Sequence, residues 1–306
     1  MAEPLAPFLE RVRRRVDEAL DRYLPSSPAC PEIVAAAMRY SVFAGGKRLR
    51  PVLTLAAAEA VDPRAFDLAL PAACAIELIH TYSLIHDDLP AMDDDDLRRG
   101  RPTLHVVYGD GIAILAGDGL HAEAFTLLAR EPATADPIVV ARKIDVARVI
   151  GEAAGPMGMV GGQAVDLQAA GQVPGHAVTL DADGLRAMHA RKTGALIRAS
   201  AVSGATMAGG GADVVRAVDA YASEVGLAFQ IVDDILDVEG DPQSLGKTTG
   251  KDAAASKPTY PSLFGLDRSR QLAAECVQRA HGAIAAARLT GSHLGAIADW
   301  VVSRTS

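Results

Sequence analysis

The sequence predicts an all-α protein, because helical spacing dominates it and no series of short alternating strands is present. Apolar residues recur every four positions near the N-terminus, at Phe8, Val12, Val16, Leu20 and Leu24. This spacing places them on one face of a helix. Residues 68–88 and 214–237 are apolar almost all round, as expected of helices buried inside a bundle.

The breaks between these helices are short, which predicts a single domain over residues 1–306. Turns rich in proline or glycine separate the helical segments, at residues 25–31, 45–51, 171–175 and 209–211. In the second of these turns, Gly45-Gly46 and Pro51 flank a basic loop. None of them resembles a long flexible linker.

The bulk composition argues against several classes of protein. A formal net charge of −8 is unlike that of a nucleic-acid-binding protein. The charged N-terminus lacks the apolar stretch of a signal peptide, and no run approaches the roughly twenty apolar residues of a membrane span. Cys30, Cys74 and Cys276 are widely spaced, which predicts small buried residues in a reducing compartment. We therefore expect a cytoplasmic protein.

An aspartate-rich segment at the end of the first long apolar stretch is the first feature that indicates chemistry. Six of the ten residues from Asp87 to Asp96 are aspartate. Asp87 and Asp88 fall at a helix C-terminus, where the helix dipole disfavours negative charge. Pro90 interrupts the helix, so the chain can bend and bring Asp93 toward Asp87. A solvated acidic loop is the alternative, but this much like charge predicts a bound counter-ion.

The second long apolar stretch carries another cluster, formed by Asp233, Asp234 and Asp237. Asp233 and Asp237 are four residues apart and share one helix face. An N-cap would explain one of these aspartates, but not three within an apolar segment. Carboxylates without His or Cys partners favour Mg²⁺, which is usually shared with phosphate oxygens. Two such clusters therefore predict a phosphorylated ligand between them.

Basic residues beside glycines are candidates for binding that phosphate. In the loop that begins with Gly45, Lys47 and Arg50 can donate charge-assisted hydrogen bonds, although the spacing is not that of a Walker P-loop. Others flank acidic residues or threonines: Arg98, Arg99, Lys192 with Thr193, Lys247 and Lys257. Each alone is compatible with an ordinary surface charge. His80 lies two turns before Asp87 on the same face, so it is either a core histidine or a ligand.

Taken together, these segments closely resemble those of the trans-prenyltransferases, the isoprenyl diphosphate synthases. The matching segments, in the family's order, are Gly45-Gly46-Lys47-Arg48-Leu49-Arg50-Pro51, His80-Thr81-Tyr82-Ser83-Leu84-Ile85-His86-Asp87-Asp88, Leu97-Arg98-Arg99-Gly100, Lys192-Thr193, Phe229-Gln230, Asp233-Asp234-Ile235-Leu236-Asp237 and Gly246-Lys247. A lone Asp-Asp-x-x-Asp is weak evidence, but the ordered set is highly specific. The first motif has two extra residues, and this form is similar to that of the bacterial farnesyl diphosphate synthase subgroup.

The resemblance implies an isoprenoid synthase-type helical bundle around a deep central cavity, and a homodimer. It implies that three Mg²⁺ bind the allylic diphosphate and are held by Asp87, Asp93 and Asp233. Asp88 and Asp237 would bind metal-bound water. The other residues expected on the allylic side are Asp234, Arg98, Lys192, Thr193, Gln230 and Lys247. The residues expected for isopentenyl diphosphate are Gly46, Lys47, Arg50, His80 and Arg99, and Lys257 is a further substrate-binding candidate.

The implied reaction is head-to-tail prenyl transfer from dimethylallyl or geranyl diphosphate to isopentenyl diphosphate. Neutralising the leaving diphosphate lets the allylic C–O bond break, and the double bond of isopentenyl diphosphate attacks the resulting cation. A class I terpene cyclase is one alternative, but it would not need the second basic site of Lys47, Arg50 and His80. A non-catalytic synthase subunit is another, but it should have lost aspartates from one cluster.

Tyr82 is the candidate determinant of product length. It lies five residues before Asp87, about 7.5 Å along a helix axis, so its ring can form the floor of a tail cavity while Ser83 leaves space. An ordinary core tyrosine is the alternative. In the resembling family an aromatic residue here accompanies fifteen-carbon products, which implies farnesyl diphosphate; geranylgeranyl or geranyl diphosphate are the alternatives. The C-terminal segment has one basic residue, Arg304, so we do not expect it to close the site.

Overall fold

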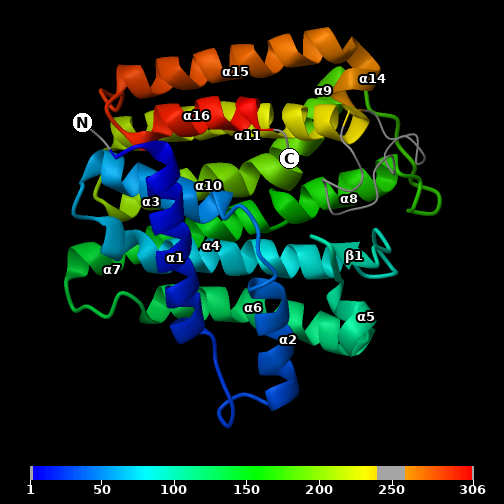
Figure 1. The fold of residues 1–306 in the computed structure, drawn as a ribbon, viewed down its shortest axis with the longest axis horizontal. Helices are drawn as coiled ribbons and strands as arrows, with labels where there is room; N and C mark the ends of the chain where they lie inside the picture. The colour runs from blue at the N-terminus through cyan, green and yellow to red at the C-terminus, as the bar shows by residue number, and fades with distance from the viewer. Residues whose placement is uncertain (1–2, 240–258, 305–306) are drawn as a thin grey trace.

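The computed structural model describes residues 3–239 and 259–304, and it confirms the all-α class (Figure 1). The helices, in chain order, are α1 (Leu5–Tyr23), α2 (Glu32–Val42), α3 (Leu49–Val61), α4 (Phe66–Asp87), α5 (Leu104–Tyr108), α6 (Asp110–Arg130), α7 (Pro137–Ala154), α8 (Met159–Ala169), α9 (Ala182–His189), the π-helical turn η1 (Ala190–Gly194), α10 (Ala195–Met207), α11 (Ala212–Glu239), α14 (Tyr260–Phe264), α15 (Leu266–Ala286) and α16 (His293–Ser303). In the described chain the only strands form a two-residue antiparallel hairpin, β1 (Leu97–Arg98) and β2 (Arg101–Pro102), which the sequence did not predict.

Helices α4 and α10 form the centre of the bundle. Helix α4 packs against α1, α2, α3, α6, α7 and α10, and α10 also packs against α3, α7 and α11. In Figure 1 they run between α11, α15 and α16 above and α6 and α7 below. The central position of α4 explains why its sequence is apolar on all sides. Ile76, Leu78 and Ile79 lie on different sides of the helix, and all three are fully buried.

The predicted apolar face of the first helix is also confirmed. All five of its predicted residues are buried, four in α1 and Leu24 directly after it. Two local predictions were wrong. Helix α3 already begins at Leu49, so Pro51 lies in its first turn, where a missing N–H costs no helical hydrogen bond. Cys30 is only half-buried, because it lies in the turn before α2, whereas Cys74 and Cys276 are buried.

Helices α4 and α6 are long and apolar enough to cross a membrane by length and composition, contrary to the reading of the sequence. In α4, 78% of the apolar window is buried, so the core explains its composition. In α6 only 39% of the window is buried, and apolar side chains such as Ile114 and Leu115 remain exposed. The apolar character of α6 therefore needs a second explanation, and the absence of a membrane span stays a prediction.

Candidate active site

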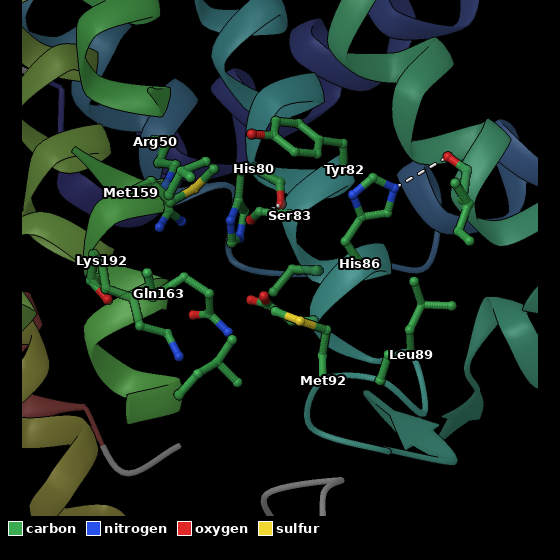
Figure 2. A pocket seen from close by; sticks show the side chains of 18 residues that line it. Arg50, His80, Tyr82, Ser83, His86, Leu89, Met92, Met159, Gln163 and Lys192 are labelled. Carbon is green, nitrogen blue, oxygen red and sulfur yellow. Dashed lines mark hydrogen bonds between the residues drawn. The ribbon is translucent and has the colours of Figure 1, made fainter. Parts of the chain in front are cut away.

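A cavity of about 600 Å³ lies between α4 and α8, with contributions from α3, α6 and η1 (Figure 2). Its polar lining comes from Arg50, His80, Ser83, His86, Asp87, Gln163, Lys192 and Thr193. Its apolar lining includes Leu89, Met92, Ile114, Met159, Val160 and Leu167. Figure 2 shows Lys192 and Gln163 across the cavity from His80 and Met92. A cavity of this kind suits a ligand with a charged head and an apolar tail.

Arg50 and His80 line the basic side of the cavity, and the exposed Arg99, which does not line it, lies close enough for its charge to act on both. The Arg50 Nε is buried without a hydrogen-bond partner in the described chain, and burial lowers the pKa of Arg50 to about 10. Burial, followed by the charges of Arg50 and Arg99, lowers the pKa of His80 well below its ordinary value, so His80 is neutral at pH 7. Gly46 has a φ of +124°, and a Cβ there would collide with the Arg99 guanidinium. Two neighbouring guanidinium groups, one of them with an unsatisfied donor, favour the binding of an anion.

Arg48, in the same basic segment, has a different role. It is only 4% exposed and donates hydrogen bonds to Glu77 at 2.9 Å and to Asp17 at 3.0 Å. A third bond goes to the carbonyl of Val42. The guanidinium of Arg48 thus ties α1, α2 and α4 together, while Arg50, the second residue of α3, lines the cavity.

The first aspartate cluster folds back as predicted. The Asp93 N–H donates to the carbonyl of Asp87 at 2.9 Å, which brings Asp93 beside the end of α4. Burial raises the pKa of Asp87 to about 6, with Lys192 acting in the opposite direction. Asp88 is buried and accepts two bonds from the Arg98 Nε, at 2.7 and 2.9 Å. Arg98 therefore neutralises Asp88 and leaves Asp87 facing the cavity.

Lys192 lies in the π-helical turn η1, opposite the end of α4. Its Nζ is 2.5 Å from the Asp166 Oδ2 of α8. Burial opposes the charge on Lys192, but Asp166 and Asp87 hold its pKa above the ordinary value. A Cβ at Gly162 would lie 2.2 Å from the Lys192 backbone nitrogen, so this glycine allows α8 and η1 to pack closely.

Asp166 and Gln163 are site residues that the sequence analysis missed. Asp166 orients Lys192, and the Gln163 Nε2 is buried in the cavity wall without a partner in the described chain. Both follow the pair Gly161-Gly162, three residues apart on α8. These two residues could have been identified from the sequence, because they are polar, follow paired glycines and interrupt a segment of otherwise small and apolar residues.

The second aspartate cluster lies near the C-terminal end of α11. Asp234 is buried and accepts hydrogen bonds from the Tyr260 N–H at 2.9 Å and from Gln230 at 3.2 Å. Asp233 is more exposed, and its Oδ1 is 2.6 Å from the Arg304 Nη2. Asp237 is half-buried one turn further on. Arg304 was not expected at this site.

The two clusters meet at a smaller cavity of about 170 Å³. Its polar lining consists of Asp93, Asp166, His189, Lys192, Thr193, Gln230, Asp234 and Thr259. Lys192 and Thr193 also line the larger cavity, so the two spaces share one wall. Seven of the predicted site residues that the structure describes line neither space: Gly46, Lys47, Asp88, Arg98, Arg99, Asp233 and Asp237. Lys247 and Lys257 lie outside the described residues.

Tyr82 forms part of the cavity wall, and its role as the floor stays a prediction. It is 8% exposed, and its ring stacks on His121 of α6 with a centroid separation of 4.7 Å. His121 in turn contacts Phe125 edge-on, and Tyr82 contacts His86 in the same manner. The ring of Tyr82 is therefore held between α4 and α6 by aromatic neighbours, while Ser83 beside it is small.

The donor set fits Mg²⁺ that is shared with a phosphorylated ligand. In residues 3–239 and 259–304, no three Asp, Glu, His or Cys side chains converge closely enough to hold a metal ion alone. The oxygens of Asp87 and Asp93 on one side and Asp233 on the other are hard ligands, which suit Mg²⁺. Mg²⁺ typically takes one or two carboxylates and completes its shell with water and phosphate oxygens.

The helical bundle holds two aspartate clusters and a basic pocket around an apolar cavity. These features together define a class of proteins that bind ligands with an anionic head group and an apolar tail. Residues 31–288 match the polyprenyl synthetase family, and the chain belongs to that family. It is 43% identical to the farnesyl diphosphate synthase of Geobacillus stearothermophilus over 97% of each chain. It is 48% identical to the heterodimeric geranylgeranyl pyrophosphate synthase large subunit 1 of Arabidopsis thaliana, over 84% of this chain and 68% of the relative. A crystal structure of an FPP/GFPP synthase from Zymomonas mobilis superimposes with a TM-score of 0.84 at 37% identity, covering 98% of this chain and 99% of the other.

Proposed function

We propose that the protein is a Mg²⁺-dependent prenyltransferase that makes (2E,6E)-farnesyl diphosphate. It joins dimethylallyl diphosphate, and then geranyl diphosphate, head-to-tail to isopentenyl diphosphate and releases diphosphate. The observation that carries this proposal is the 600 Å³ cavity, which has charged residues on one side and an apolar wall that includes Tyr82. The farnesyl diphosphate synthase of Geobacillus stearothermophilus supports the assignment.

The residues of this chain divide the two substrates between them. Lys192, oriented by Asp166, together with Asp87, Asp93 and Asp233 defines the allylic diphosphate site. Three Mg²⁺, when bound, would neutralise negative charge on the leaving diphosphate. Arg50, neutral His80 and Arg99 bind the diphosphate of isopentenyl diphosphate on the other side. Apolar residues of the larger cavity exclude water from the allylic cation.

A direct assay tests the proposed reaction. The protein is incubated with isopentenyl diphosphate and either dimethylallyl or geranyl diphosphate, with MgCl₂ or with EDTA, and the dephosphorylated products are separated by chromatography. Fifteen-carbon product that requires Mg²⁺ is the expected result. A main product of twenty carbons would instead assign a geranylgeranyl diphosphate synthase, and cyclised hydrocarbon without use of isopentenyl diphosphate would indicate a terpene cyclase.

The product length depends on Tyr82 in this proposal. Tyr82→Ala removes the ring from the cavity wall, so the product should lengthen to twenty carbons or more. Tyr82→Phe keeps the ring and its packing on His121, and it should still yield fifteen carbons. Unchanged chain length in Tyr82→Ala would reject the role of Tyr82 as the floor.

We also propose that the protein is a cytoplasmic homodimer in which the exposed apolar face of α6 is covered by a second copy. Val106 and Val107 of α5, which packs on α6, are exposed as well, as is Leu115 of α6. The Arabidopsis relative, a large subunit of a heterodimeric enzyme, supports assembly through a family surface. Light scattering should give a dimer for the wild type and a monomer for Leu115→Glu.

The membrane is the alternative partner for α6, and recovery of the protein in the membrane fraction would assign α6 to a membrane. Binding to nucleic acid is not expected, because the net charge of the protein is −8.

A further inference from the structure

The C-terminal residue of the described chain makes three contacts on α11. Arg304 follows α16, and its guanidinium lies over the ring of Phe229 at 3.9 Å from the centroid. Its Nη2 donates to the carbonyl of Phe229 at 2.7 Å and is 2.6 Å from the Asp233 Oδ1. Phe229 and Asp233 are one helical turn apart, so a single guanidinium spans both.

The burial of this arginine makes the contact with Asp233 important. The side chain of Arg304 is 3% exposed, whereas that of Asp233 is 38% exposed. A buried guanidinium needs a negative partner, and for Arg304 this partner is the carboxylate of Asp233. The same oxygen is one that a metal ion would need, and a divalent cation beside the guanidinium would be repelled by it.

We propose that Arg304 and Mg²⁺ compete for Asp233, so that metal binding at the second cluster releases the C-terminal segment from α11. Arg304 is in this sense a positioning residue, which holds the second cluster in a metal-free state. This inference rests on the proposed role of Asp233 as a metal ligand. This competition could not be expected from the sequence alone, because a single basic residue near the C-terminus does not indicate its partner on α11.

The chain contains its own reporter for this event. Trp300 is the only tryptophan, and it lies one turn before Arg304 on α16. Release of Arg304 should change the surroundings of Trp300, whereas Mg²⁺ binding at the first cluster should not reach it. Tryptophan emission therefore distinguishes Mg²⁺ binding at the second aspartate cluster from Mg²⁺ binding at the first, and the measurement needs no substrate.

The test compares Mg²⁺ binding in the wild type, Arg304→Gln and Arg216→Gln. Arg216→Gln is the matched control, because it removes an exposed guanidinium paired with Asp213 at the other end of α11. Each protein is titrated with MgCl₂ at constant ionic strength, while heat and Trp300 emission are recorded. If Arg304 occupies Asp233 about nine-tenths of the time, Arg304→Gln should bind Mg²⁺ about tenfold more tightly. Its emission should resemble that of the Mg²⁺-saturated wild type from the start.

Several results would overturn this inference. A merely structural arginine would leave the Mg²⁺ affinity unchanged or weaken it on substitution, and either outcome contradicts competition. A wild-type Trp300 emission that does not respond to Mg²⁺ also contradicts it. Turnover of the two diphosphates is measured in parallel: an active wild type whose Mg²⁺ affinity equals that of Arg304→Gln rejects the inference while the proposed function stands.

Discussion

In both aspartate clusters the first residue of an Asp-Asp pair is partly exposed and the second is buried. The buried residues are held differently. Asp88 accepts hydrogen bonds from the Arg98 guanidinium, whereas Asp234 accepts from a backbone N–H and an amide. The exposed residues differ as well, since Asp87 lies near Lys192 and Asp93, and Asp233 contacts Arg304. In each Asp-Asp pair, therefore, the first aspartate is available to bind a ligand and the second stabilises the fold.

The largest expected effect is on turnover, and it concerns Asp87 and Asp233, the partly exposed residues of the two Asp-Asp pairs. Asp87→Ala and Asp233→Ala should each reduce kcat by about three orders of magnitude, because stabilisation of the leaving group by metal contributes about 4 kcal/mol. Asp94→Asn is the matched control, since Asp94 is exposed and has a left-handed φ that asparagine tolerates. Steady-state kinetics at saturating Mg²⁺ measures the effect, and near-normal turnover of folded Asp87→Ala would reject the metal assignment.

The second prediction concerns the pH dependence of metal-free stability. The pKa of Asp87 is raised from 3.8 to about 6, so between these values the folded state binds more protons than the unfolded state and stability falls as the pH rises. Asp87→Asn removes this penalty. It should stabilise the metal-free protein by about 1.5 kcal/mol at pH 5 and about 3 kcal/mol at pH 8.

Urea unfolding in EDTA at the two pH values measures this difference. Asp94→Asn should show no comparable change between pH 5 and pH 8. A stabilisation by Asp87→Asn that is the same at both values would mean that the carboxylate of Asp87 is not destabilised by burial.

The comparison also shows what the sequence could and could not predict. The helical spacing predicted the buried face of α1 and the extent of α4 and α11, because side-chain burial along a helix is a local pattern. The return of Asp93 to Asp87 followed from Pro90, only a few residues away. These features depend on the chain near each residue.

Contacts between distant segments were the ones that could not be predicted. Arg48 and Arg50 are two residues apart and look alike, yet Arg48 pairs with Glu77, 29 positions away. Asp166 reaches Lys192 across 26 positions, and Arg304 lies over the ring of Phe229 from the last described position of the chain. No periodicity links such pairs, so only the packing of the bundle reveals them.

The third prediction tests the charged partner of the first cluster. Asp88→Asn should destabilise the protein by about 2 kcal/mol, because a hydrogen bond between ionised groups is worth about 1.5–3 kcal/mol. Burial opposes charge on both partners and raises the pKa of Asp88 although Arg98 acts to lower it, whereas the hydrogen bonds to Asp88 hold the pKa of Arg98 above its ordinary value. We expect the two short hydrogen bonds to outweigh the burial of Asp88. Asp88→Ala should cost a similar amount, since both substitutions remove the closest negative partner of Arg98 and leave, in the described chain, only the more distant Asp95, at 3.8 Å. Urea unfolding at pH 7.5 measures both, and a loss in Asp88→Ala much greater than in Asp88→Asn would show that shape matters more than charge.

The smallest effect is expected for the corresponding residue of the second cluster. Asp234→Asn retains an oxygen that can accept from the Tyr260 N–H, and the amide of Gln230 can turn to present its own oxygen to the new NH₂ group. The change in these two hydrogen bonds should therefore cost about 1 kcal/mol or less. Asp234→Ala removes these two bonds and leaves the buried Tyr260 N–H without this acceptor, which should cost about 2–3 kcal/mol. The loss of stability in the asparagine variant, divided by the loss in the alanine variant, thus distinguishes the two clusters. This ratio should be near one at Asp88 and clearly below one at Asp234. Equal losses for the two Asp234 variants would mean that the charge of Asp234, and not its hydrogen-bond geometry, holds α14 to α11.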